Sequence, residues 1–174
     1  MRFFIITVLS LLIVSCAPIR VNYDYDSATS FNNYKTYQYY ADMNTGLSEL
    51  DTNRLLDALD AKMTEKGYSI SKTPDFFIDI KSRSYQEGPK STVGIGMGGT
   101  SGNVGGGVSV GIPVGEGHIN REITIDFVDH SKNKLFWQAV SESSYNPDAS
   151  PEVRDNMLKA IVEKVLSQYP PEKK

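Results

Sequence analysis

The chain has little cysteine, little histidine and no excess of basic residues, and each shortage excludes a class of protein. Cys16 is the one cysteine among 174 residues, so no disulfide can form within a chain and packing must stabilise the fold. Eighteen basic and 21 acidic side chains give a net charge of −3, which argues against a nucleic-acid partner. The two histidines, His118 and His130, are too few for a zinc site, and we expect neither a metal nor a cofactor.

Long apolar runs are also scarce, and the longest lies at the N terminus. Phe3 to Val14 is an almost unbroken run of 12 residues after the positively charged Arg2. A permanent membrane span needs about 20 apolar residues, so this run is too short to be one. A positive charge followed by a short apolar run is typical of a bacterial export signal, and we expect residues 1–15 to be a signal peptide that is removed.

The end of this run, Ile13-Val14-Ser15-Cys16, resembles the lipobox of bacterial lipoproteins. The resemblance implies diacylglycerol on the Cys16 thiol, cleavage before Cys16 and acylation of the new amino terminus. Each buried methylene contributes ~0.8 kcal/mol, so several chains on one residue make a stable anchor. Cys16 is therefore the expected lipid-attachment site, with residues 16–19 as a lipidated tether. The alternatives are an ordinary signal peptide with an incidental cysteine and a buried free thiol.

The residues after Cys16 bear on location. Ala17 stands where lipoproteins retained in the inner membrane of well-studied Gram-negative bacteria carry Asp, and no acidic cluster follows. By resemblance to that sorting system, we expect an outer-membrane lipoprotein that faces the periplasm.

Residues 20–169 are expected to form a single α+β domain, and residues 170–174 a tail. Apolar and polar residues alternate in four stretches, and a fifth is rich in tyrosine, which predicts strands. Two stretches have an apolar stripe at helical spacing, Ser48 to Lys66 and Ser150 to about Gln168. The order predicts an antiparallel or mixed sheet with both amphipathic helices on one face, a two-layer sandwich. The expected strands are residues 21–26, 34–40, 75–82, 119–129 and 135–141.

Two sets of residues in these elements invite a choice between a structural and a functional interpretation. Asp51, Asp57 and Asp60 lie on the first helix and could be metal ligands, but we expect a solvated helix face because no oxygen-rich loop joins them. Trp137 could be a ligand platform, but its alternation with Leu135 predicts that both face the core.

Residues 88–117 form a glycine-rich insertion that holds 12 of the 14 glycines. Gly94 to Gly99 formally matches the dinucleotide fingerprint, but the glycines that follow prevent the helix which that site requires. Alternating apolar residues from Val93 to Met97 and from Val108 to Val114 fit a long hairpin, and a disordered loop is the alternative. A hairpin could add strands to the sheet or meet a protein partner by edge pairing.

Several of these features together resemble the bacterial lipoprotein family called domain of unknown function 4136. They are the lipobox, Tyr23-Asp24-Tyr25-Asp26, Phe31 with Tyr34-Lys35-Thr36-Tyr37, Lys66-Gly67-Tyr68, Pro74-Asp75-Phe76, the glycine-rich insertion, Ile125-Asp126-Phe127-Val128-Asp129, Leu135-Phe136-Trp137-Gln138 and Tyr169-Pro170-Pro171. The resemblance implies an envelope lipoprotein of one α+β domain, with no established activity and no catalytic residues to carry over.

We therefore expect a non-enzymatic binding or scaffolding module of the cell envelope, with a possible protein partner at residues 88–117. One alternative is an envelope hydrolase, which requires His118 or His130 in a deep pocket, hydrogen-bonded to a serine and a carboxylate. Another is a carrier of a small ligand, which requires a large apolar cavity between helices and sheet.

Overall fold

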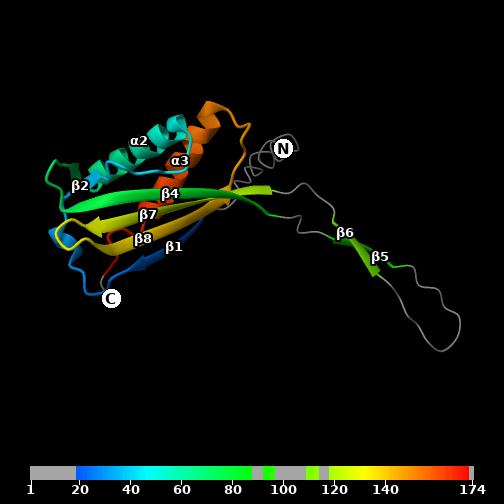
Figure 1. Cartoon of the computed structure of the whole chain (residues 1–174), viewed down its shortest axis with the longest axis horizontal. Helices are drawn as coiled ribbons and strands as arrows, with labels where there is room; N and C mark the ends of the chain where they lie inside the picture. The colour runs from blue at the N-terminus through cyan, green and yellow to red at the C-terminus, as the bar shows by residue number, and fades with distance from the viewer. Residues whose placement is uncertain (1–18, 88–91, 97–108, 114–117, 173–174) are drawn as a thin grey trace, which may run out of the picture.

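The computed structural model describes residues 19–87, 92–96, 109–113 and 118–172. Six strands form one mixed sheet in the order β1-β8-β7-β4-β2-β3, and β5 and β6 form a second, two-stranded sheet. The helices α2 and α3 lie together on one face of the six-stranded sheet (Figure 1), which confirms the expected α+β fold. The elements are β1 (Arg20–Tyr25), the 3-10 turn η1 (Phe31–Asn33), β2 (Thr36–Tyr39), α2 (Glu49–Glu65), β3 (Ser69–Ile70), β4 (Phe76–Glu87), β5 (Thr92–Gly96), β6 (Ser109–Pro113), β7 (His118–Asp129), β8 (Lys134–Ser144) and α3 (Pro151–Leu166).

The centre of the sheet is an antiparallel meander, in which β7 pairs with β4 on one side and with β8 on the other. β1 returns to the edge and pairs antiparallel with β8, from Arg20 opposite Glu142 to Tyr25 opposite Trp137. β2 runs parallel to both β4 and β3, which makes the sheet mixed. The two-residue strand β3 was not predicted, because two residues are too few to show a period.

Both helices begin at the serines that the sequence indicates. The Ser48 hydroxyl accepts a hydrogen bond from the Asp51 amide at 3.2 Å, and the Ser150 hydroxyl accepts one from the Val153 amide at 3.4 Å. Gly67 follows the end of α2 with φ of +86°, a conformation in which glycine carries no Cβ penalty.

The core lies between the helices and the helix-facing positions of β4, β7 and β8. Trp137 is 1% exposed, which confirms that it is a core residue. Its ring lies 4.6 Å from that of Phe127 and 5.0 Å from that of Tyr169, measured between centroids. The residues of these strands and of α2 that are wholly buried are Phe76, Ile78, Ile80, Ile123, Ile125, Phe127, Ala139, Leu55, Leu59 and Met63.

One detail of β8 differs from the alternating pattern. The pairing shifts by one residue between Phe127, which is opposite Trp137, and Val128, which is opposite Leu135. Such a bulge places two successive residues on the same side of the sheet. Phe136 and Trp137 are therefore both buried, and Leu135, expected to share the inner face with Trp137, is 43% exposed.

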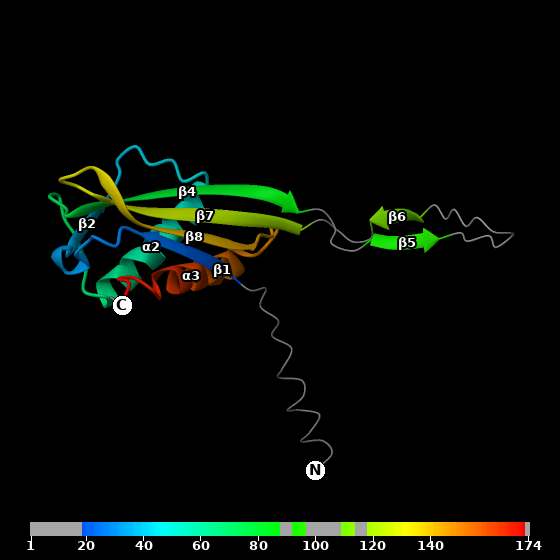
Figure 2. The ribbon, with the colours of Figure 1, turned by 90° about the horizontal axis from the view of Figure 1, so that it is seen from below.

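The glycine-rich segment contains an antiparallel pair of strands that keeps the register of β4 and β7. Glu87 pairs with His118, and Thr92 pairs with Pro113, the first pair of β5 and β6. Thr92 is five residues after Glu87 and Pro113 is five residues before His118, so the two pairs share one register. The two strands lie beyond the ends of β4 and β7 (Figure 2). The described part of this segment is thus the continuation of one long hairpin, and we call residues 88–117 the arm.

The expected signal peptide, residues 1–15, and the expected lipid-attachment site, Cys16, lie outside the described residues. Within the described ranges, neither helix is long and apolar enough to cross a membrane.

Candidate functional site

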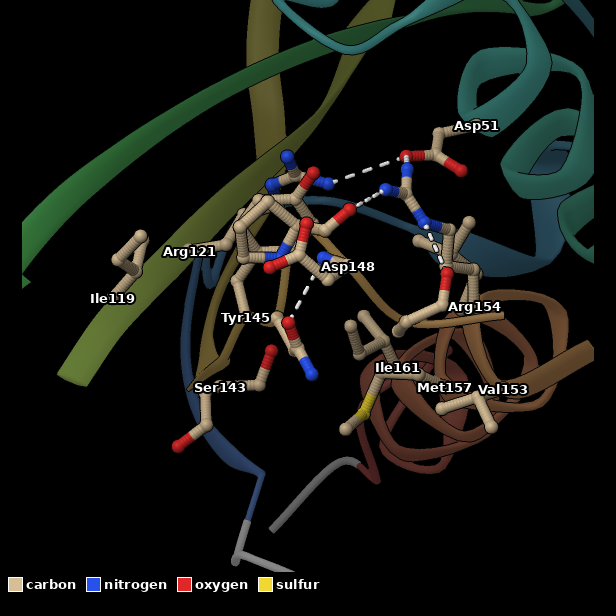
Figure 3. Close-up of a pocket in the computed structure, with 15 residues that line it drawn as sticks. Asp51, Ile119, Arg121, Ser143, Tyr145, Asp148, Val153, Arg154, Met157 and Ile161 are labelled. Atoms are coloured by element: carbon tan, nitrogen blue, oxygen red, sulfur yellow. Dashed lines mark hydrogen bonds and ion pairs between the residues drawn. The ribbon is translucent and has the colours of Figure 1, made fainter. Parts of the chain in front are cut away.

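One pocket lies where the first turns of α2 and α3 meet the sheet, at the end from which the arm leaves. Its volume is about 610 Å³, within the range of small-molecule sites. Figure 3 shows side chains from α2, β7, β8 and α3, and from the loop between β8 and α3, around it. Five segments that are distant in the sequence thus build one site.

Asp51, in the first turn of α2, is the acidic centre of the pocket wall, and its side chain is only 2% exposed. One carboxylate oxygen accepts a hydrogen bond from Arg54 at 2.8 Å, and the other accepts one from Arg154 at 3.0 Å. Arg121 of β7 lies 3.6 Å from the same oxygen as Arg154. The expectation that Asp51 lies on a solvated helix face is therefore wrong, because the helix places it under three arginines from three elements.

Arg154 ties this cluster to the loop between β8 and α3. Its Nε donates to the carbonyl oxygen of Ala149 at 3.2 Å, and its Nη2 donates to the carbonyl oxygen of Pro147. With the bond to Asp51, all the edges of this guanidinium are engaged. Arg154 therefore acts as a structural clamp that fixes the shape of the pocket rim.

Arg121 is engaged differently, although its side chain is only 12% exposed. Its guanidinium carbon lies 3.4 Å from the ring centroid of Tyr145, a cation–π contact at close range. Its Nε donates to the Ser84 hydroxyl at 3.3 Å. Arginine carries five N–H donors, and in the described part of the chain the four terminal donors of Arg121 make no hydrogen bond. Arg121 is thus a cation that its neighbours fix in place, with terminal N–H donors that make no hydrogen bond in the described structure.

The opposite side of the pocket is apolar. Val153, Met157 and Ile161 project from α3 toward the cavity (Figure 3). Val153 is 55% exposed at the rim, whereas Ile161 is buried at 1%. The pocket therefore combines a cationic, aromatic wall on β7 and the β8–α3 loop with an aliphatic wall on α3.

A second pocket, of about 600 Å³, lies at the other end of the sheet, around Asp129. Tyr34 and Ser131 donate to the Asp129 carboxylate, each at 2.7 Å, and so does the Lys132 amide, also at 2.7 Å. Burial opposes ionisation of Asp129, but these hydrogen bonds outweigh burial and hold its pKa below the ordinary value. The group is a fully satisfied buried carboxylate, which indicates a structural role.

In the described structure, His130 does not come together with a serine and a carboxylate. His130 lies at the exposed rim of the second pocket, where its ring meets that of Phe77 edge-on at 5.1 Å. Within the described residues, its imidazole makes no hydrogen bond, and the neighbouring Ser131 donates to Asp129 instead. His118 begins β7 at the opposite end of the sheet, opposite Glu87.

The other helix carboxylates have different surroundings. Asp60 accepts hydrogen bonds from the hydroxyls of Tyr37 at 2.8 Å and Tyr39 at 2.7 Å, so it too is more than a solvated residue. Burial and this carboxylate together raise the pKa of both tyrosines. Asp57 is exposed, as expected. In the part of the chain that the structure describes, no three His, Cys, Asp or Glu residues gather as metal ligands would.

The sequence profile of the family "Domain of unknown function (DUF4136)" matches residues 21–171. The chain belongs to this family. The match confirms the resemblance drawn from the sequence motifs and spans nearly the whole described domain. No curated protein matches the chain.

Similar solved structures share this fold at low sequence identity. A PDZ domain protein from Parabacteroides distasonis ATCC 8503 is 12% identical with a TM-score of 0.56 over 98% of this chain, which spans only 40% of that protein. PelC from Paraburkholderia phytofirmans, solved as a dodecamer, is 9% identical with a TM-score of 0.53 over 90% of this chain and 100% of PelC. A variant of that dodecamer gives a TM-score of 0.44 at 12% identity, over 86% of this chain and 95% of its own.

Sequence reasoning did not find the pocket. Arg121 and Arg154 belong to segments with ordinary strand and helix patterns, and neither forms a motif with Asp51. One signal was available: Arg121 occupies a helix-facing position of β7, where the alternation with Ile123 and Ile125 predicts an apolar residue.

Proposed function

We propose that this member of the family is a non-enzymatic binding or scaffolding lipoprotein of the bacterial cell envelope. In this proposal acyl chains on Cys16 hold it in the outer membrane, the domain faces the periplasm, and the arm meets a protein partner. The lipobox-like stretch before Cys16 supports the anchor, and the family match supports the domain.

The observation that carries the proposal is the register of the arm. β5 and β6 pair with each other in the register of β4 and β7, and they form a narrow two-stranded ribbon separate from the six-stranded sheet. Each strand of a two-stranded ribbon has one edge without a neighbour in the described structure, and such edges can accept a strand from another chain. Isolated two-stranded hairpins are marginal in water, so a partner that pairs with the ribbon would also stabilise it.

The anchor is tested by Cys16→Ser with Ser15→Ala as the matched control. We expect the first variant to lose incorporation of labelled palmitate and to remain an unprocessed precursor, because thiol alkylation precedes cleavage in the pathway that the lipobox resembles. The control replaces one small residue with another and should mature normally. Recovery of mature, outer-membrane Cys16→Ser protein would overturn the anchor.

The arm is tested with a photo-crosslinking residue at Thr92, compared with the same residue at Glu163 on the exposed side of α3. We expect a discrete adduct in intact cells from position 92 only. Gly94→Pro should remove the adduct, because proline cannot donate to the strand ladder. Equal adducts from both positions, or an adduct that survives Gly94→Pro, would contradict a ribbon-mediated contact.

A further inference from the structure

The pocket beneath Arg121 combines two chemistries that one ligand can satisfy together. Arg121 offers terminal N–H donors that the described protein leaves unbonded, and the planar guanidinium matches the two oxygens of a carboxylate or phosphate. Val153, Met157 and Ile161 face it with aliphatic surface. We propose that this pocket binds a small anionic amphiphile, with its carboxylate or phosphate head on Arg121 and its apolar chain along α3.

The charges around Arg121 leave it available to an anion. Arg121 and Arg154 line the pocket together with Asp51 and Asp148, and Asp148 lies exposed at the rim. The charges of these four lining residues balance, and Arg54, which pairs with Asp51 from outside the lining, adds one positive charge. The first turns of α2 and α3 both open toward the pocket, and helix N-terminal ends carry partial positive charge.

The three arginines differ in whether they can bind a ligand. Arg154 already donates hydrogen bonds to Asp51 and to two loop carbonyls, and Arg54 lies outside the pocket lining. Arg121 is held from three sides by Tyr145, Ser84 and Asp51 and is therefore pre-organised. Because Arg121 is already fixed, binding a ligand head costs little of the arginine's side-chain entropy.

The position of the pocket fits a lipid-like ligand, an argument that rests on the proposed anchor. Arg20 pairs with Glu142, two residues before the end of β8, where the pocket loop begins. Four Cα-to-Cα steps separate Cys16 from Arg20 and span at most about 14 Å. An anchor on Cys16 therefore holds the pocket end of the domain close to the bilayer surface.

The experiment uses the full chain in neutral maltoside micelles with [1-13C]decanoate as the probe. We expect a saturable carboxyl resonance, separate from that of micelle-dispersed decanoate, at one ligand per chain. Its pKa should be lower than that of dispersed decanoate, because Arg121 favours the ionised form. Absence of this resonance would overturn the proposal, even if the anchor on Cys16 is confirmed separately.

Two pairs of variants locate the head group. Arg121→Gln should weaken decanoate binding at least tenfold, whereas Arg83→Gln, which removes an exposed arginine on the opposite face of the sheet, should not. Val153→Asp adds a carboxylate at the exposed rim without disturbing the core, and should weaken binding where the neutral Val153→Asn does not. If Arg121→Gln fails to fold, the Val153 pair still decides. Equal binding by Val153→Asp and Val153→Asn would overturn the anionic head.

Two further probes separate the chemistry. [1-13C]Acetate should bind at least tenfold more weakly than decanoate, because it lacks the chain, and equal binding would overturn the amphiphile in favour of a plain anion site. Decyl phosphate in place of decanoate distinguishes the source: tighter binding of decanoate indicates a free fatty acid, and tighter binding of decyl phosphate indicates a lipid phosphate head.

Discussion

The two ends of the same three strands differ in what they present to the helices. At one end the inner positions of β4, β7 and β8 are aromatic, with Phe76, Phe127 and Trp137 all buried. At the other end the same faces carry Ser84, Arg121 and, among the buried residues, Ser143. Aliphatic residues lie between them, so each strand grades from aromatic through aliphatic to polar along its helix-facing side.

This gradient separates a closed core from an open pocket. The aromatic end is closed by rings in mutual contact, such as Tyr34 stacked on Phe136 at 4.2 Å. The polar end holds its groups with hydrogen bonds and ion pairs around a pocket, and the arm leaves from there. The same three strands therefore form a core at one end and a pocket wall at the other.

The largest expected effect is at the aromatic end. Trp137→Ala should lower the free energy of unfolding by about 3–5 kcal/mol, because it removes a buried aromatic and leaves a cavity. Leu135→Ala, two residues away but 43% exposed, is the control and should cost well under half as much. Denaturant unfolding measures both. Similar values for the two variants would mean that the bulge does not set the inner face of β8.

A smaller loss is expected at the polar end from Asp51→Asn. Removing one partner of a buried ion pair typically costs 3–5 kcal/mol, but these arginines keep some access to water, so we expect about 2–3 kcal/mol. Asp57→Asn removes the same charge from an exposed position of α2 and should change little. The comparison fails if both variants unfold at the same denaturant concentration.

At the aromatic end, loss of the hydrogen bond from Tyr34 to Asp129 should lower the free energy of unfolding by about 1.5–3 kcal/mol, the range for hydrogen bonds to a charged group. This loss should depend on pH. Because the native pKa of Asp129 is lowered, its stabilisation is fully present above the ordinary Asp value of about 3.9 and is lost as the pH falls through the native pKa. Tyr34→Phe should therefore be less stable than the wild type at pH 7, and the difference should shrink as the pH falls below the ordinary Asp value. A difference that is constant with pH would exclude the Tyr34–Asp129 bond as its cause.

The smallest effect is expected from the arm. Replacing residues 90–116 with a short Asn-Gly turn should change the melting temperature by only a few degrees, because the paired strands β4 and β7 remain joined and glycine-rich sequence buries little apolar surface. A deeper replacement, of residues 84–121, removes Arg121 and Ser84 and should be clearly less stable. Failure of the first variant to fold, or a melting temperature lowered as far as that of the second variant, would show that the arm belongs to the core.

Local patterns in the sequence determined most of the fold. Period-two alternation identified the strands β4 and β7, and apolar stripes at helical spacing identified both helices, because each pattern depends on neighbours within a few residues. The same patterns, with the motifs around them, identified the family. They also predicted a hairpin in the arm, as one of two alternatives, from the alternation on either side of its glycines.

Only the tertiary structure decided what Asp51, Arg121 and Arg154 do. Asp51 and Arg154 are 103 residues apart in the chain, and they meet because α2 and α3 pack side by side over the sheet. The bulge that buries Phe136 beside Trp137 depends likewise on how β8 pairs with β7. The spacing of apolar residues along one segment indicates which face of that segment is buried. The partner of a charged side chain lies on a different segment, so that spacing cannot predict it.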